Sequence, residues 1–366
     1  MKVAVIFGTR PEAIKMAPVV RALRAAPDFA CRVWSTGQHR QMLDQVLDFF
    51  DIPLDVDLSI MRSGQSLNDV FAAVIAGVDQ TMAEERPDLV LVHGDTTTAS
   101  AAAVAAFNRG VPVGHVEAGL RSGRLDQPWP EEFNRRIVDM VSRHLFAPTA
   151  VARDNLLREG AEADRVLVTG NTVIDALLHT VDRIQGDTIL KRSLEREYAF
   201  INDKRPLLLV TGHRRESFGT GFENICTALA RLAEEPIEIV YPVHLNPNVQ
   251  TPVRRLLANR PNIHLIDPID YPRFVYLMTR AAIILTDSGG VQEEAPSLAK
   301  PVLVMRDVTE RPEAIAAGVA RLVGTTASTI VSGVMDALRG PAPTASNPYG
   351  DGRAAVRILE DLRRWR

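Results

Sequence analysis

Apolar and polar positions alternate in blocks along the whole chain. Short apolar runs bounded by turn residues are separated by longer segments in which apolar residues recur at helical spacing. This alternation is typical of βα units and predicts a parallel sheet with helices on its faces. Helical spacing in the first half covers Ala13–Ala25, Leu67–Glu85 and Thr97–Asn108. The strands expected there are Lys2–Phe7, Cys31–Thr36, Leu89–His93, Pro112–Val116, His144–Ala147 and Val166–Thr169.

The second half repeats this plan, so we expect an α/β protein with two doubly wound domains. Its expected strands are Leu207–Thr211, Ile237–Val243, Ile263–Ile266, Ile283–Thr286, Val302–Met305 and Arg321–Val323. A length of 366 residues agrees with two domains. We place the boundary near Gly170–Val173 and expect the last helix, Gly352–Arg364, to return to the first domain. The predicted domains are residues 1–171 with 352–366, and residues 172–351.

Composition narrows the class of protein. Apolar residues at 46% and charged residues at 24% are typical of a soluble globular protein. A net charge of −3 gives no general attraction to nucleic acid or to anionic membranes, so any anion site must be local. No apolar run approaches the ~18 residues of a membrane span, and we expect a cytoplasmic protein. The two cysteines, Cys31 and Cys226, are far apart and are expected to be core thiols rather than a disulfide or zinc pair.

The turn after the expected strand Ile283–Thr286 has the composition of a phosphate site. Ser288, Gly289 and Gly290 stand where a helix would begin, so their N–H groups would be unpaired and the helix dipole would favour an anion. Glu294, about one turn further, is placed to accept hydrogen bonds from a ribose diol. The alternative is an ordinary helix start capped by Asp287 or Ser288.

In open α/β sheets ligands bind beyond the carboxyl ends of the strands, and charged residues follow several strands of the first half. Arg10 and Lys15 could supply cations to a diphosphate. Glu117 emerges directly from a buried strand, which makes its pKa a candidate for tuning. Asp95 and Glu131 also follow strands, although Asp95 could simply cap the next helix and Glu131 could simply favour a helix start.

In the second half, His213 and Arg214 follow the strand Leu207–Thr211, close to where the diphosphate is expected. Arg311 is a further candidate for a nucleotide contact. Metal chemistry has little support, because the only D-x-D string, Asp55–Asp57, lies in a stretch that follows no buried strand. We therefore expect neither a metal nor a cofactor, with arginine, lysine and helix dipoles neutralising the diphosphate.

Together these motifs closely resemble the bacterial non-hydrolysing UDP-N-acetylglucosamine 2-epimerases. The likeness covers nearly the whole chain, including Asn347–Gly352. The segments that carry it are Gly8–Pro18, Gly37–Arg40, His93–Thr97, Gly114–Arg121, Pro130–Glu132, Gly170–Thr172, Gly212–Glu216 and Asp287–Glu294. The resemblance implies a GT-B fold in which two Rossmann-like domains form the active site in the cleft between them. It also implies reversible conversion of UDP-N-acetylglucosamine to UDP-N-acetylmannosamine, a precursor of cell-envelope polysaccharides.

The family's chemistry explains a cluster of acids. The C2 hydrogen is not next to a carbonyl, so the family eliminates UDP across C1–C2 to form 2-acetamidoglucal and then adds UDP back with the opposite C2 configuration. By resemblance the acid-base set is Asp95, Glu117, Glu131 and His213, and the identity of the C2 base is left open. His213 with Arg10 would stabilise the leaving diphosphate. The UDP site would comprise Arg10, Lys15, Ser288, Gly289, Gly290, Glu294 and Arg311, with Phe274 near the uracil.

The resemblance also implies a second, activating UDP-N-acetylglucosamine site and a homodimer. The matching positions for the activator are Gln38, Gln41, Gln65, Arg214, Glu216 and His244. One position departs from some relatives, which have glutamine where this chain has Ile269, so a uracil contact there would come from the backbone. Two other functions stay open, a glycosyltransferase of the same fold and a non-catalytic nucleotide-sugar sensor.

Overall fold

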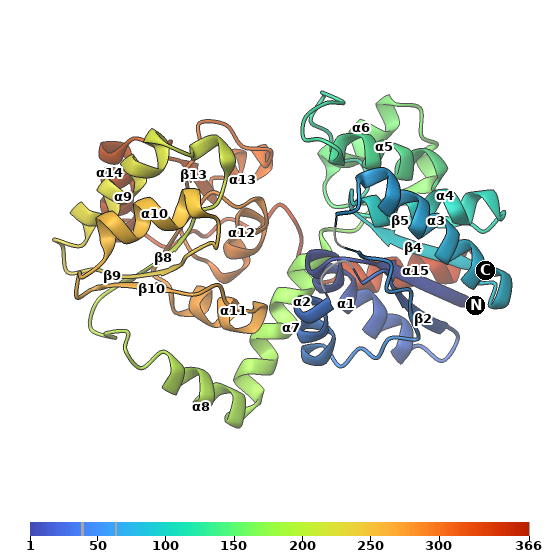
Figure 1. Cartoon of the computed structure of the whole chain (residues 1–366), viewed down its shortest axis with the longest axis horizontal. Coiled ribbons are helices and arrows are strands. Elements are labelled where there is room, and N and C mark those ends of the chain that lie inside the picture. Colours follow the sequence, from blue (N-terminus) through green and yellow to red (C-terminus); the bar gives the residue numbers. More distant parts are fainter. Residues whose placement is uncertain (38–39, 63, 366) are drawn as a thin grey trace. The chain divides into compact units, whose positions relative to one another are not determined.

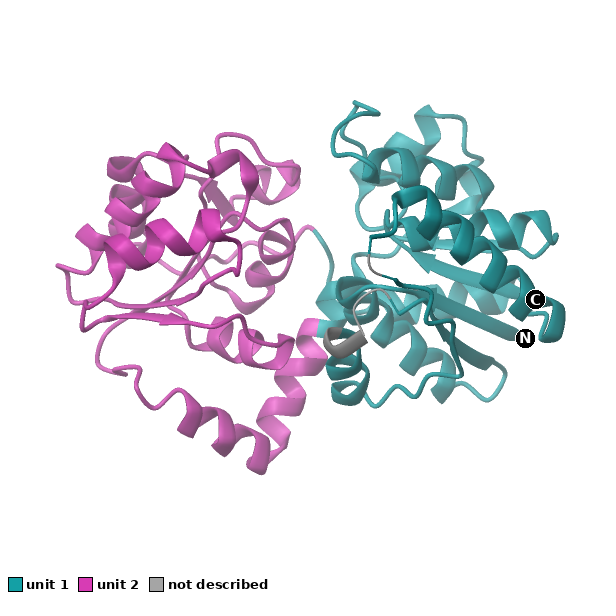
Figure 2. Ribbon diagram, viewed as in Figure 1, with its two compact units in different colours: residues 1–176, 349–366 teal, residues 177–348 magenta. Residues whose placement is uncertain are grey.

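A computed structural model describes residues 1–37, 40–62 and 64–365, without the side chains of residues 40–42. The chain divides into two compact units, coloured separately in Figure 2. The first unit comprises Met1–Ala176 with Tyr349–Arg366, and the second comprises Leu177–Pro348. The chain passes from the first unit to the second within helix α7 (Thr172–Gly186). The predicted division into domains, at 171/172 and 351/352, stays a prediction.

The described residues of the first unit form a seven-stranded parallel sheet in the order β3-β2-β1-β4-β5-β6-β7. Strands β2, β4 and β5 of this sheet are labelled in Figure 1. Its strands are β1 (Lys2–Phe7), β2 (Ala30–Ser35), β3 (Val56–Asp57), β4 (Leu89–His93), β5 (Val113–Val116), β6 (His144–Ala147) and β7 (Val166–Val168). Its helices are α1 (Arg10–Ala25), α2 (Arg40–Phe49), α3 (Leu67–Glu84), α4 (Thr97–Asn108), α5 (Glu131–Val141), α6 (Ala150–Arg158), η1 (Ala163–Arg165) and α15 (Ala354–Arg364).

The strand order reverses between β1 and β4, which makes that pair the topological switch point of the sheet. The six strands predicted for this half are confirmed, but strand β3 was missed. Val56 pairs with Trp34 at the sheet edge, in the stretch that we expected to follow no buried strand. A two-residue edge strand has no apolar run by which to recognise it, which explains the error.

The described residues of the second unit form a six-stranded parallel sheet in the order β10-β9-β8-β11-β12-β13. Its strands are β8 (Leu207–Thr211), β9 (Glu238–Pro242), β10 (Ile263–Ile266), β11 (Ile283–Thr286), β12 (Val302–Val304) and β13 (Ala320–Leu322). Its helices are α8 (Thr188–Glu197), η2 (Arg215–Ser217), α9 (Thr220–Leu232), α10 (Pro247–Leu257), α11 (Tyr271–Arg280), α12 (Gly289–Glu294), η3 (Ala295–Leu298), α13 (Pro312–Ala316) and α14 (Ala327–Arg339). Here the switch point lies between β8 and β11, so the two sheets share one plan.

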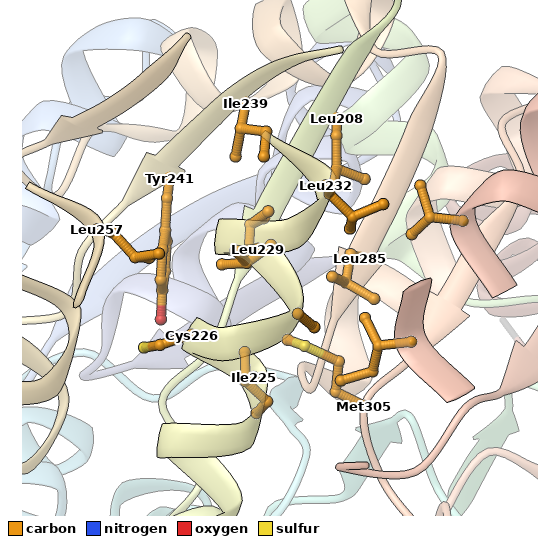
Figure 3. Close-up of a cluster of buried hydrophobic side chains, with 14 of the residues drawn as sticks. Leu208, Ile225, Cys226, Leu229, Leu232, Ile239, Tyr241, Leu257, Leu285 and Met305 are labelled. Carbon is orange, nitrogen blue, oxygen red and sulfur yellow. The ribbon is translucent and has the colours of Figure 1, made fainter. Parts of the chain in front are cut away.

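The core of the second unit shows why helical spacing predicts its helices correctly. Ile225, Cys226, Leu229 and Leu232 recur on one face of α9 and are fully buried against the sheet (Figure 3). Burial of such side chains contributes about 1.5–3 kcal/mol each and fixes the helix on its strands. Both cysteines are free thiols; Cys226 is buried as predicted, whereas Cys31 is only partly buried.

The C-terminal helix packs on the first unit, as predicted. Helix α15 lies against α1, and the carboxylate of Asp175 accepts the N–H groups of Ala354 at 3.1 Å and Ala355 at 2.9 Å. Arg363 near its end pairs with Asp28 at 3.2 Å. None of the helices in the described part of the chain has the length and apolar character needed to cross a membrane.

Candidate active site

In the first unit, the turns that follow β4 and β5 lie side by side at the carboxyl edge of the sheet. His93 and Val116 are partners in the parallel ladder, so the next residues, Gly94 and Glu117, are neighbours. A Cβ atom built on Gly94 would lie 3.4 Å from Oε2 of Glu117. The carboxylate of Glu117 therefore lies beside the turn that carries Asp95.

Glu117 is held in place by polar groups from other segments. Its side chain is 8% exposed and forms an ion pair with Lys15 of α1. Asn171 donates an N–H to Oε1 of Glu117 at 2.8 Å, and Nε2 of His93 lies 3.5 Å from Oε2. The backbone of Glu117 has φ +72°, a left-handed conformation that is strained for a residue with a Cβ. Such strain is common at functional sites, where the surroundings fix one side-chain position.

His93 is an uncharged neighbour of this carboxylate. Burial lowers the pKa of His93 to about 3, although the charge of Glu117 acts in the opposite direction. The imidazole is therefore neutral over the physiological range. Our sequence analysis assigned no role to His93 or Asn171, although both lie in segments that carry the family resemblance.

Asp95 and Glu131 are brought to the same edge by helix α5. Arg135 forms an ion pair with Asp95, and Asn134 donates to the backbone carbonyl of Asp95 at 2.9 Å. Glu131 is the first residue of α5, as predicted. Its Oε2 atom is buried, and no described group forms a hydrogen bond with it. The structure thus places Glu117 beside the Asp95 turn, and the helix that begins at Glu131 is bound to Asp95.

Asp95 does not cap the following helix, so that alternative is wrong. The side chain of Thr96 caps α4 by accepting the N–H of Ala99 at 3.0 Å. Thr96 also donates its hydroxyl to Glu12 at 2.7 Å. Thr96 therefore caps the helix, and the carboxylate of Asp95 pairs with Arg135 instead.

The turn after β1 is anchored by the buried carboxylate of Glu12. Oε2 of Glu12 accepts the N–H groups of Gly8 at 3.1 Å and Thr9 at 2.8 Å. Burial raises the pKa of Glu12 above its usual value, and these hydrogen bonds oppose the shift. Arg10 begins α1 beside this anchor and has no ion-pair partner among the described residues. Thr9 followed three residues later by Glu12 is a capping box, a signal that could have identified Glu12.

In the second unit, Asp287 joins the turns after β8 and β11. Its Oδ2 accepts the N–H groups of His213 at 2.7 Å and Arg214 at 2.8 Å. Ser288 is the N-cap residue of α12, as the alternative expected, but its side chain forms no capping hydrogen bond with that helix start. Asp287 is not the cap.

The imidazole of His213 faces the same aspartate, with Nδ1 lying 3.3 Å from Oδ1 of Asp287. Burial lowers the pKa of His213, and the charge of Asp287 opposes that shift. The ring is thus mainly neutral near pH 7 in this structure. An anion bound next to it would favour the protonated form.

Two guanidinium groups lie over the glycine turn. A Cβ atom on Gly289 would lie 3.7 Å from Nη2 of Arg214 and 3.7 Å from Nη2 of Arg311. Arg311 forms an ion pair with Glu293, whereas Nε of Arg214 is buried without a hydrogen-bond partner among the described residues. The turn therefore presents main-chain N–H groups and two cations, a combination suited to an anion.

Glu294 lies at the other end of α12, almost fully buried. Its Oε1 accepts the hydroxyl hydrogen of Tyr271 at 2.6 Å, and burial raises the pKa of Tyr271 well above its usual value. Tyr271 begins α11, the helix that also carries Phe274. The ribose and uracil candidates thus come from neighbouring elements of one unit.

The six candidate activator residues have varied surroundings. Gln38 lies outside the described residues, and of Gln41 only the place in α2 is described. Gln65 bonds within its own loop, donating to the carbonyl of Ile60 at 3.1 Å. Glu216 pairs with Arg306 at 2.5 Å, and the ring of His244 stacks on His213 with centroids 5.7 Å apart. Arg214 belongs to the glycine turn described above.

Both sheets share one strand plan, and polar residues gather at the switch point of each. Two such sheets define a protein of the GT-B fold class. The family model for UDP-N-acetylglucosamine 2-epimerase matches residues 21–363. The chain belongs to this family of isomerases. It is 55% identical to the UDP-N-acetylglucosamine 2-epimerase of Escherichia coli (strain K12) over 370 residues, covering 99% of this chain and 98% of the relative.

Solved structures show the same relationship. The UDP-GlcNAc 2-epimerase from Neisseria meningitidis, bound to UDP-GlcNAc, superposes with a TM-score of 0.92 at 48% identity, and each chain is covered completely. The enzyme from Methanocaldococcus jannaschii, in complex with UDP-GlcNAc and UDP, superposes with a TM-score of 0.84 at 32% identity, again with complete coverage of both chains.

Proposed function

We propose that this isomerase interconverts UDP-N-acetylglucosamine and UDP-N-acetylmannosamine by eliminating UDP and adding it back. The observation that carries the proposal is that Glu117 lies beside the turn that carries Asp95, while α5, which begins at Glu131, binds Asp95 through Asn134 and Arg135. A carboxylate takes the C2 proton, and the C2–H electron pair forms the C1=C2 bond of 2-acetamidoglucal. The C1–O electron pair leaves with UDP. Re-addition of UDP to C1 and of a proton to the opposite face of C2 gives the epimer.

Glu117, Asp95 and Glu131 share the proton transfers in this proposal. Glu117 is the most strongly positioned of them, because Lys15, Asn171 and a strained backbone fix it. Lys15 was expected to contact the diphosphate, but it pairs with Glu117 in the structure without substrate. It would either keep Glu117 ionised as a base or turn to the departing phosphate once Glu117 has taken the proton.

The second unit holds UDP in this proposal. The turn Ser288–Gly290 receives the diphosphate through the N–H groups of Gly289 and Gly290 and the guanidinium group of Arg311. The N–H group of Ser288, expected to be unpaired, donates to Oγ1 of Thr286 at 2.9 Å. Glu294 accepts hydrogen bonds from the ribose, and Phe274 lies near the uracil. His213 and Arg10 stabilise the negative charge that develops on the leaving group, with His213 taking a proton as the anion approaches.

The proposal has four further parts. A second molecule of the substrate acts as an activator, and the enzyme is a homodimer. It is located in the cytoplasm, and its product supplies the synthesis of cell-envelope polysaccharides. The complex of the Methanocaldococcus jannaschii enzyme with both UDP-GlcNAc and UDP supports nucleotide binding by relatives. Gln38, Gln41, Gln65, Arg214, Glu216 and His244 are the residues that we propose for the activator.

Cleavage of the C1–O bond can be tested with substrate that carries ¹⁸O in the bridge between C1 and the β-phosphorus. Elimination frees the β-phosphate to rotate, so the label should scramble to non-bridging positions in recovered UDP-N-acetylglucosamine. Epimerisation without scrambling would contradict elimination. Free N-acetylmannosamine with UDP would indicate hydrolysis, and transfer to an added acceptor without epimerisation would indicate a glycosyltransferase.

A further inference from the structure

A buried charge network lies beneath the two turns that carry Asp95 and Glu117. Its centre is Asp139 on α5, whose side chain is 5% exposed. One oxygen of Asp139 contacts Nδ1 of His115 at 2.6 Å. The other accepts an N–H of Arg121 at 2.7 Å and the backbone N–H of Gly119 at 3.3 Å. Both oxygens of this carboxylate are therefore occupied by hydrogen-bond donors.

His115 connects this carboxylate to the neighbouring turn. Its Nε2 lies 2.8 Å from the carbonyl oxygen of Gly94, the residue before Asp95. Both ring nitrogens thus lie within hydrogen-bond distance of an oxygen atom. Burial disfavours ionisation of Asp139, but the neighbouring His115 and Arg121 outweigh burial and lower its pKa. The network joins a carboxylate, an imidazole and a guanidinium group through buried hydrogen bonds.

The network fixes the backbone on both sides of Glu117. His115 precedes Glu117 by two residues on β5, and Gly119 follows it by two residues in the turn. Asn155 donates to the carbonyl of Gly119 at 2.9 Å, which leaves little freedom at that point. Glu117 itself has a strained φ of +72° and depends on such neighbours to stay in one conformation.

We propose that Asp139 is a positioning residue, which through His115 and Gly119 holds the Asp95 and Glu117 turns in the geometry needed at C2. The proposal rests on the proposed function of those carboxylates. Asp139 itself touches no reacting atom. Its loss should reduce proton transfer at C2 while leaving the UDP half of the site, on the second unit, unchanged.

Asp139→Asn is the sharpest test because it keeps the shape of the side chain. The amide has one acceptor oxygen, so it keeps the N–H groups of Arg121 and Gly119 only by turning its NH₂ group to Nδ1 of His115, where the carboxylate presented an acceptor. We expect kcat for epimerisation to fall about 10- to 100-fold, with KM for UDP-N-acetylglucosamine and the Kd of UDP changed less than about threefold. His115→Asn breaks the other end of the same path. The double variant should be no slower than the slower single variant, since both break one connection.

A matched control is available in the second unit. The buried Glu238 at the start of β9 and the partly buried His264 on β10 form a pair 2.5 Å apart, away from the carboxyl edge of that sheet. Glu238→Gln should leave kcat within about twofold of wild type. The fraction of folded protein is measured for each variant, and rates are given per folded molecule. If Asp139→Asn does not fold, His115→Asn alone carries the test.

Three results would overturn the proposal: wild-type kcat in the Asp139→Asn or His115→Asn variant, rate losses that multiply in the double variant, or an equal loss in Glu238→Gln. A wild-type enzyme that does not interconvert the two UDP-sugars would instead refute the proposed function. The two failures are therefore distinguishable.

Discussion

At the scale of single residues, Glu117 shows how a carboxylate can be prepared for proton transfer. It leaves a buried strand in a strained conformation and contacts a lysine, an amide and a neutral imidazole. A solvated surface glutamate needs no such surroundings. These contacts argue that Glu117 is placed for chemistry rather than for solubility.

Replacement of Glu117 by glutamine should separate chemistry from binding. The amide keeps the shape of the side chain but cannot take a proton, so we expect kcat to fall about 10²- to 10⁴-fold. The Kd of UDP, measured by calorimetry, should stay near the wild-type value because Glu117 is not among its proposed contacts. Full activity of Glu117→Gln would show that this carboxylate is not used.

Glu294 gives the complementary prediction for nucleotide binding. Glu294→Ala removes the proposed ribose acceptor and leaves the hydroxyl of Tyr271 without its partner. A hydrogen bond to a charged group contributes about 1.5–3 kcal/mol, so UDP affinity should fall about 10- to 100-fold. Tyr271→Phe keeps the carboxylate and should have a smaller effect. Unchanged affinity in Glu294→Ala would remove the ribose contact from the account.

The low pKa of His93 leads to a prediction about how the stability of the protein depends on pH. Its pKa is about 3 in the folded chain and about 6.5 when unfolded, so the unfolded state binds the proton first as the pH falls. The stability it contributes is present above pH 6.5 and is lost progressively between pH 6.5 and pH 3. Between pH 6 and pH 4, the free energy of unfolding should fall less steeply in His93→Asn than in wild type, by up to about 1.4 kcal/mol per pH unit.

The measurement is a urea titration followed by tryptophan fluorescence at several pH values. Trp34, Trp129 and Trp365 all belong to the first unit, so their fluorescence reports on the unit that contains His93. Equal pH slopes for wild type and His93→Asn would contradict the assigned protonation state.

At the scale of elements, the turn after β5 requires particular residues for its backbone as well as for its carboxylate. Gly119 has φ +84°, and a Cβ atom there would lie 2.3 Å from the carbonyl oxygen of Ala152 in α6. Gly123 has a similar φ of +78° but open space around it. The two glycines therefore separate the cost of the backbone conformation from the cost of a steric clash.

Gly123→Ala should destabilise the first unit by about 1–2 kcal/mol, the cost of a left-handed conformation. Gly119→Ala should cost clearly more, because the added methyl group must also displace α6. Tryptophan fluorescence during urea unfolding checks both variants. Equal effects would mean that the turn adjusts without disturbing α6.

The elements themselves were largely predictable, and their polar contacts were not. Apolar runs located strands such as β4 and β11 because buried parallel strands are nearly all apolar. Strand β3 was missed because two edge residues leave no pattern. The sequence also placed Asp95 and Asp287 at strand ends, but not their partners. Asp95 pairs with Arg135, and Asp287 lies against His213. Both partners come from other parts of the chain, so the local sequence does not show what these aspartates bind.

At the scale of the whole molecule, one strand plan is used twice with different chemistry at the two switch points. At the first, Glu117 lies beside the turn that carries Asp95, and at the second, guanidinium groups lie around Gly289. A nucleotide sugar carries both kinds of partner, a sugar with a proton to transfer and a diphosphate to neutralise. The family to which the chain belongs is named for such a molecule.

The central claim is that UDP-N-acetylglucosamine loses and regains its C2 proton while UDP is detached. The most direct test is incubation with UDP-N-acetylglucosamine in D₂O, followed by NMR and mass spectrometry of the UDP-sugars. The account predicts an equilibrium mixture of the gluco and manno epimers, both still linked to UDP and both carrying deuterium at C2. Epimers that keep their original C2 hydrogen, or an unchanged substrate, would contradict it.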